Sequence, residues 1–423
     1  MKVFPSRFFI ALTFCFFCSC AYLGDYIDGT PSLLSKSPET KDNASSEQSK
    51  QVEVKERESE PASQSTEITK ISPAFDERSL KLVKVPNSEI VEIYPLFLNT
   101  NAKSTLLDLL TVSQDGHVLL RKSREKFKNA YKLFKLKPGF STAAISRRGK
   151  FLAVAYPGDV EIIDLATKQS AYSLKRISSR VSSMEFSPDD TGLLLAGVDA
   201  AVYRWRFVLE KKARSILEGE QSFERYIGHS AVVNLARYHP FGRVFVSSDW
   251  GGAINAWLMF DQDKYQGRYD ENIFIGRTFS EEMNRVRGSR KVVSIIEQIR
   301  FSDDGQHIYL ADEDGTLDIW TTRGFKSVAS FAAVHKGKIF DLSIDSVNKR
   351  VVTIGRDGIL KVSQVVIADS KVPGIKDYTL PMLKMIALRE IGIENARKVL
   401  YLNSDNVAVT NAEGKVMLVE IKS

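Results

Sequence analysis

Five histidines are the residues best suited to metal binding or general acid–base catalysis in this chain of 423 residues. They lie far apart, at His117, His229, His239, His307 and His335. None stands at a metal-ligand spacing from another. The sequence also lacks the Gly-x-Ser-x-Gly, His-Glu-x-x-His and P-loop motifs, which would position a nucleophile, a zinc ion or a phosphate. We therefore expect no catalytic residue, no metal ion and no cofactor.

All three cysteines lie within the first twenty residues of the chain. Lys2 and Arg7 precede an apolar run over residues 8–17, which is the layout of a secretory signal. An apolar run of about ten to fifteen residues is too short to cross a bilayer core, which needs about 20. The sequence therefore predicts an exported protein.

The segment 17–20, Phe-Cys-Ser-Cys, resembles the lipobox of bacterial lipoproteins. The resemblance implies that residues 1–19 are removed as a signal peptide and that Cys20 is acylated, for example with palmitate, as the mature N-terminus. Ala21 after the cysteine, rather than Asp, implies the outer membrane, on its periplasmic side, in a Gram-negative cell. The alternative is that the cysteines only act as small apolar residues of a signal helix.

Residues 20–75 have the composition of a linker. They are rich in Ser, Glu, Lys, Gln and Pro and hold almost no periodic apolar residues, so they cannot bury a core of their own. We expect a disordered tether, and about 50 flexible residues have a root-mean-square span of about 40 Å.

An internal repeat organises the remainder, residues 76–423. Seven β-type hairpin motifs recur, with turn positions at Gly116, Gly158, Ala200, Gly252, Gly315, Gly358 and Gly414. Their short spacings cluster at 42 to 43 residues, the length of a four-stranded propeller blade. The residue before the turn is acidic in five copies, at Asp115, Asp199, Asp314, Asp357 and Glu413, and acid–Gly pairs supply the positive φ of two-residue hairpin turns. The pattern predicts an all-β, seven-bladed β-propeller.

Tryptophans and a Gly-His pair carry a family resemblance. Trp205, Trp257 and Trp320 each follow their turn position by five residues, and Gly228-His229 stands where a repeat opens. In these features the chain resembles the WD40-repeat β-propellers over roughly residues 77–423. The Trp position is filled differently in the other copies, by Arg121, Ile163, Ser363 and Val419. No blade shows a complete His-Ser-Asp-Trp set in sequence, so we expect apolar strand packing to provide most of the stability.

The two ends of the repeat region suggest how the ring closes. The last copy ends after its third strand, and residues 79–85 alternate polar and apolar side chains just before the first inner strand near Ile90. We predict that residues 79–85 supply the missing outer strand of the last blade, which removes two open sheet edges.

Three spacings exceed the repeat length, and the extra residues lie within 208–222, 261–291 and 367–381. The first and third, and in one interpretation the second, fall between third and outer strands on one face, where long loops on a rigid scaffold often bind partners. The alternative is neutral surface elaboration. The second loop contains the candidate interaction residues Tyr265, Arg268, Tyr269, Arg285 and Arg287.

A basic run covers residues 121–137, with eight basic residues and one acidic residue. Its candidate interaction residues are Arg121, Lys122, Arg124, Lys126, Lys128 and Lys132. We expect the run at the outer edge of the first blade, where it would attract anionic lipid head groups, acidic glycans or an acidic protein. The alternative is an ordinary solvated strand and loop. Nucleic acid is not expected as a partner of an exported protein.

These observations together favour a non-enzymatic lipoprotein. We expect a membrane-anchored propeller that serves as a protein-interaction scaffold in a bacterial cell-envelope complex for secretion, motility or outer-membrane assembly. One alternative is a propeller enzyme, quinoprotein-like or hydrolytic, with its site in the central channel. Another is a cytosolic WD40 scaffold, if the N-terminus is not a signal.

Overall fold

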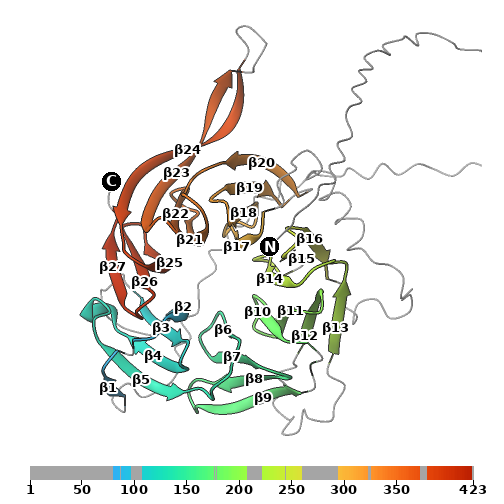
Figure 1. Ribbon diagram of the computed structural model, residues 1–423, viewed down its shortest axis with the longest axis vertical. Coiled ribbons are helices and arrows are strands. Elements are labelled where there is room, and N and C mark those ends of the chain that lie inside the picture. Colours follow the sequence, from blue (N-terminus) through green and yellow to red (C-terminus); the bar gives the residue numbers. More distant parts are fainter. Residues whose placement is uncertain are drawn as a thin grey trace, which may run out of the picture. The chain divides into compact units, whose positions relative to one another are not determined.

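The computed structural model describes residues 80–96, 107–206, 222–259, 294–371 and 379–421, apart from single residues at 86, 176, 178, 243, 323 and 324. The chain divides into two units, residues 1–66 and 67–423, and every described residue belongs to the second. The described strands form seven antiparallel sheets, which surround a common centre (Figure 1). This unit is an all-β, seven-bladed β-propeller, as the repeat predicted.

The blades follow one another along the chain, and most have four strands. Blade 1 consists of β2 (Ile90–Leu96), β3 (Asp108–Ser113), β4 (His117–Arg121) and β5 (Ala130–Lys135), with a short 3-10 helix, η2 (Ser123–Glu125), before β5 and with β1 (Lys81–Val83) at its outer edge. Blade 2 consists of β6 (Thr142–Ile145), β7 (Phe151–Tyr156), β8 (Asp159–Asp164) and β9 (Gln169–Lys175). Blade 3 consists of β10 (Val181–Phe186), β11 (Gly192–Gly197), β12 (Ala201–Arg206) and β13 (Ser222–Ile227). Blade 4 consists of β14 (Val233–Tyr238), β15 (Val244–Asp249) and β16 (Ile254–Leu258). Blade 5 consists of β17 (Ile296–Phe301), β18 (His307–Asp312), β19 (Leu317–Thr321) and β20 (Lys326–Phe331). Blade 6 consists of β21 (Ile339–Asp345), β22 (Arg350–Gly355), β23 (Ile359–Lys371) and β24 (Thr379–Gly392). Blade 7 consists of β25 (Ala396–Asn403), β26 (Asn406–Asn411) and β27 (Val416–Glu420).

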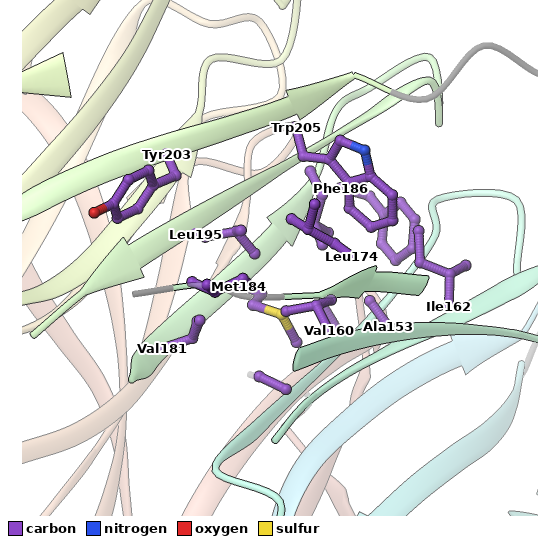
Figure 2. Packing of buried hydrophobic residues seen from close by; sticks show 14 of the residues in the cluster. Ala153, Val160, Ile162, Leu174, Val181, Met184, Phe186, Leu195, Tyr203 and Trp205 are labelled. Carbon is purple, nitrogen blue, oxygen red and sulfur yellow. The ribbon is translucent and has the colours of Figure 1, made fainter. Parts of the chain in front are cut away.

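The second strand of each blade is the most deeply buried. β7 and β11 are buried along almost their whole length, because the neighbouring blades cover both faces of the sheet. A strand buried on both faces needs apolar side chains at successive positions, and the sequences FLAVAY and GLLLAG supply them. Figure 2 shows the resulting cluster between blades 2 and 3, where Phe186 and Trp205 pack with Ile162.

The first strands surround the centre of the ring, and six of them carry a β-bulge immediately after their first residue. A bulge re-aims the side chain of the unpaired residue. In blades 3 and 4 these residues are Ser182 and Asn234, whose side chains donate hydrogen bonds to the carbonyl oxygens of Val233 and Ile296. Each acceptor is the first residue of the next blade's first strand, so the bulges link neighbouring blades.

The prediction for residues 79–85 was wrong in its partner. β1 is a strand, but it pairs antiparallel with β5 of blade 1, with Leu82 opposite Tyr131, and not with the last blade. The preceding Leu80 packs against the apolar cluster between blades 1 and 2. The packing of Leu80 therefore holds this segment on the outer edge of blade 1. The alternation of polar and apolar residues alone could not distinguish that edge from the outer edge of blade 7.

Blade 7 therefore closes on blade 1 through side chains, with no strand shared between the two sheets among the described residues. An apolar cluster joins Ile93 and Leu109 of blade 1 with Leu402 and Val416 of blade 7. At the inner strands, the guanidinium of Arg397 lies 3.4 Å from the carboxylate of Glu89.

The inserted segments lie where the spacing predicted in two of three cases. Residues 208–222 fall between β12 and β13, and residues 367–381 fall within the β23–β24 hairpin, so both connect third and outer strands. Residues 261–291 follow β16 and precede blade 5, outside the described residues.

Candidate functional site

Blade 4 contains a complete buried hydrogen-bond network that the sequence analysis did not recognise. The Nε1–H of Trp257 donates to Ser247 Oγ at 2.7 Å, and Ser247 Oγ lies 2.6 Å from His229 Nε2. Nδ1 of His229 lies 2.9 Å from the carboxylate of Asp249. The His and Asp side chains are both 0% exposed. This is the His-Ser-Asp-Trp set of the WD40 pattern, and the prediction that no blade holds it was wrong.

One arrangement of protons satisfies every contact in this network. A carboxylate only accepts hydrogen bonds, so Nδ1 of His229 donates to Asp249, and Nε2 then accepts from the Ser247 hydroxyl. That hydroxyl accepts in turn from Trp257. Burial alone would raise the pKa of Asp249, but the hydrogen bonds from His229 and from the Ala253 N–H hold it below its usual range. The network is therefore a structural element with no donor left for a substrate.

Blade 6 has a shortened version of the same network. Nδ1 of His335 lies 2.9 Å from Asp357 and Nε2 lies 2.8 Å from the Thr353 hydroxyl, while Ser363 stands in place of Trp. The residue equivalent to Asp249 is Gly355, where a Cβ would collide with the ring of His335. The acid has therefore moved into the turn, and burial lowers the pKa of His335.

The remaining turn acids and tryptophans also have structural contacts. Asp115 accepts from the Ser113 hydroxyl at 2.5 Å, and Asp199 accepts from Tyr203. Trp205 and Trp320 are buried in the clusters between blades. The N–H of Asp314 donates to Asp312 within its own turn. These residues organise hairpins and cores.

Arg121 is buried, and its assignment to an exposed interaction surface was wrong. Only 2% of the residue is exposed. It fills the Trp position of blade 1, where Nε donates to Thr111 Oγ1 at 3.4 Å and Nη2 donates to the carbonyl of Gly414 at 2.9 Å. Burial lowers its pKa to about 10, so it remains a cation at neutral pH. Because Gly414 belongs to the last blade, Arg121 bridges the seam of the ring.

Lys122 is also buried, at 6% exposure, and its Nζ lies 4.8 Å from the centre of the Tyr131 ring. The other basic candidates of this run, Arg124, Lys126, Lys128 and Lys132, are exposed on η2, β5 and the turn between them. The basic run thus lies at the outer edge of blade 1, as expected, but its first two residues do not contribute to the surface.

The first strands line a cavity of about 240 Å³ at the centre of the ring, and a second cavity of about 460 Å³ shares Glu185, Arg237 and Arg300 with it. Six charged residues line the cavity, namely Glu92, Glu185, Arg237, Arg300, Asp341 and Lys398. They come from six different blades. The channel is therefore a polar space into which almost every blade contributes a charge.

Most of these charges connect neighbouring first strands. Nη2 of Arg300 lies 3.1 Å from Asp341, and the other oxygen of Asp341 accepts from the N–H of Val399 at 3.0 Å. Glu185 accepts from the backbone N–H of Tyr238, and burial raises the pKa of its carboxyl. The channel charges therefore serve first to join the blades.

The sequence motifs considered above did not predict these channel residues. Glu185, Arg237 and Arg300 each precede the aromatic residue that ends a first strand. A charged residue recurring at that one repeat position is a signal that an alignment of the copies could have revealed, because equivalent positions in a propeller point toward the same axis.

An extended hairpin in blade 6 is the most unusual surface feature. β23 and β24 span 13 and 14 residues, whereas β22 pairs with β23 only as far as Gln364. The hairpin therefore projects beyond its blade (Figure 1). Ile367, on the projecting part, is 69% exposed, and Ile386, which pairs with Gln364 where the hairpin leaves the blade, is 49% exposed.

Several predicted site residues lie outside the described residues. These are Cys20, Tyr265, Arg268, Tyr269, Arg285 and Arg287. Within the described part of the chain, no cluster of three His, Cys, Asp or Glu residues could hold a metal ion. The same residues contain no helix of the length and hydropathy that a membrane crossing requires.

Comparison with known proteins supports the fold and no finer assignment. No known protein-family profile matches the sequence, and no curated protein matches it. Among solved structures, the chain is similar to the β-propeller domain of Myceliophteria thermophila Cps50 (Swd1), with a TM-score of 0.53 and 14% identity over 81% of this chain and 98% of that chain. At this identity the likeness concerns the fold alone, and together with the network in blade 4 it shows a seven-bladed, WD40-like β-propeller.

Proposed function

We propose that the protein is a lipid-anchored, non-enzymatic propeller that serves as a protein-interaction scaffold in a bacterial cell-envelope complex. Its N-terminal sequence supports export and acylation at Cys20. The His-Ser-Asp-Trp network of blade 4 and the related network of blade 6 are internal to their blades, whereas the extended hairpin of blade 6 is exposed. This combination is typical of a rigid platform that displays binding segments.

The observation that carries the scaffold role is the blade 6 hairpin. An exposed edge strand with apolar side chains is prone to unwanted pairing with other chains. A long exposed hairpin of this kind therefore indicates a function that its exposure serves. Ile367, Ile386 and Leu388 remain exposed on it, and β23 continues beyond Gln364, the last of its residues that pairs with β22. A partner protein that covers this hairpin would account for both its length and its apolar surface.

Site-specific photo-crosslinking in the native host tests this role. A photoreactive amino acid at position 386 should yield a discrete protein adduct. The control is the same amino acid at Val347, an 88% exposed apolar residue in a turn of the same blade, and it should yield none. Equal labelling patterns at the two positions would contradict a specific site. Affinity purification with and without residues 261–291 separately tests whether that loop binds a partner.

Metabolic labelling with palmitate tests the anchor. Label should be lost in Cys20→Ala and retained in Cys18→Ala, and only the former should leave the membrane fraction. A protein that fractionates with the cytosol in both forms would support the cytosolic scaffold instead.

The channel favours one alternative, a propeller enzyme. Glu185, whose pKa is raised by burial, lies in the same cavity as Arg237, and perturbed acids in cavities are frequent at catalytic sites. A hydrolase screen in which Glu185→Gln abolishes an activity of the purified protein would establish this alternative.

A further inference from the structure

A cationic surface lies at the outer edge of blade 1, and we call it the basic edge. It consists of the exposed residues Lys81, Lys84, Arg124, Lys126, Lys128, Lys132, Lys135 and Lys137. In the two segments that carry it, residues 80–85 and 122–137, the one acidic residue is Glu125, which accepts a hydrogen bond from Tyr131 at 2.7 Å. The position of β1, which the sequence did not predict, is what adds Lys81 and Lys84 to this surface.

The charges are closer together than the fold requires. Lys81 and Lys132 stand directly opposite each other in the β1–β5 register, and like charges at such positions destabilise a sheet. Lysine on an edge strand can protect against pairing with other strands. That explanation does not extend to Arg124, Lys126 and Lys128, which lie before β5 begins.

The form of the surface indicates its ligand. Seven of its eight bases are lysines, which act as point charges, whereas protein hot spots are rich in Trp, Tyr and Arg. The two cavities of the channel are lined by first-strand and turn residues and not by this edge. Leu82, 61% exposed, stands between Lys81 and Val83 on the outermost strand. Dispersed lysines around an exposed apolar side chain suit a planar, anionic and partly apolar surface.

We propose that the basic edge binds the anionic lipid head groups of a bilayer and so lays blade 1 against a membrane. This deepens the proposed function, since it rests on the protein residing at a membrane, but the binding itself needs no acyl chain. Each Lys or Arg near an anionic surface raises the partition coefficient about fivefold. The binding weakens with salt because it is electrostatic.

Vesicle flotation with residues 21–423, the expected mature chain without Cys20 and its acyl chains, tests the proposal. The protein should float with phosphatidylglycerol-containing vesicles and not with pure phosphatidylcholine vesicles. Exchanging Lys81, Lys128 and Lys132 for Gln should lower binding about 100-fold, and exchanging the same three for Arg should preserve it. Thermal unfolding of each variant confirms that the propeller is intact.

A matched triple variant provides the control. Lys175, Lys336 and Lys349 are exposed lysines of other blades, and their exchange for Gln should leave binding nearly unchanged. Equal losses in the two Gln variants, or equal binding to both kinds of vesicle, would overturn the proposal. Binding to heparin or polyglutamate without binding to vesicles would overturn it in favour of a glycan or protein partner. None of these results depends on acylation, so palmitate labelling at Cys20 tests the anchor separately.

Discussion

Replacing Ser247 by Ala should destabilise the propeller more than its small change in volume suggests. The Ser247 hydroxyl accepts from Trp257 and lies 2.6 Å from Nε2 of His229. Ala leaves both nitrogens without a partner in a region with no access to water. A buried polar group left unpaired costs about 1–3 kcal/mol, so two such groups predict a loss of about 3 kcal/mol in the free energy of unfolding.

Blade 6 offers an internal standard for this magnitude. Thr353 occupies the position of Ser247 but makes only the contact with His335, because Ser363 replaces the tryptophan. Thr353→Val removes one hydrogen bond and keeps the side-chain volume, so it should cost about half as much, roughly 1.5 kcal/mol. Urea unfolding of the two variants measures both values. A Ser247→Ala loss no larger than that of Thr353→Val would refute the reasoning that the two contacts of Ser247 each contribute.

Three further predictions concern the seam, the channel and a strained turn. Arg121→Ala should lower the free energy of unfolding by about 3 kcal/mol, because it removes a charged hydrogen bond and leaves a cavity. The control, Arg124→Ala at an exposed position, should change the free energy of unfolding by less than about 0.5 kcal/mol. Similar losses for the two variants in urea unfolding would contradict a bridging role for Arg121. Glu185→Gln should stabilise the protein at pH 7, because the raised pKa of Glu185 means that the folded state disfavours the charged carboxylate. The gain should shrink as pH falls through the raised pKa and vanish below the ordinary Glu pKa, where the wild-type carboxyl is protonated in both states; thermal melts from pH 7 to below pH 4 measure this. Ala200→Gly should raise the unfolding free energy by about 0.5 kcal/mol, because Ala200 has a φ of +63° where glycine is unstrained; no gain in calorimetry would show that the turn carries no strain.

The repeat predicted the fold because its signals are local. A residue of positive φ is needed at each hairpin turn, and Gly116 and Gly358, with φ of +88° and +72°, meet that need in turns between consecutive strands. The second strands identify themselves by unbroken apolar sequence, since both of their faces are covered. Neither signal depends on which other blade a strand meets.

The errors concern contacts between distant segments. Asp249 stands two residues before the position at which acids recur in the other copies. Aligning the copies therefore does not match Asp249 with those acids, and the network of blade 4 cannot be recognised in the sequence. Only the fold shows that the carboxylate of Asp249 reaches His229. Arg121 begins a basic run and was therefore assigned to the surface, although its partner Gly414 lies 293 residues away. A local charge pattern contains no information on such a partner.

The seam between blades 7 and 1 explains why an arginine occupies the position of a tryptophan. A ring closed by a shared strand is joined across its ends by backbone hydrogen bonds. In the described part of this chain β1 adds to blade 1 instead, and side chains join the two sides of the seam. An indole in the position of Arg121 has one donor, which the Thr111 hydroxyl would satisfy within its own blade, as Ser247 does for Trp257. A guanidinium has five donors, so it can bond Thr111 and still reach the Gly414 carbonyl of the last blade. The burial of this cation, which is costly without a paired carboxylate, thus occurs at the seam, where the described residues of blades 7 and 1 share no strand.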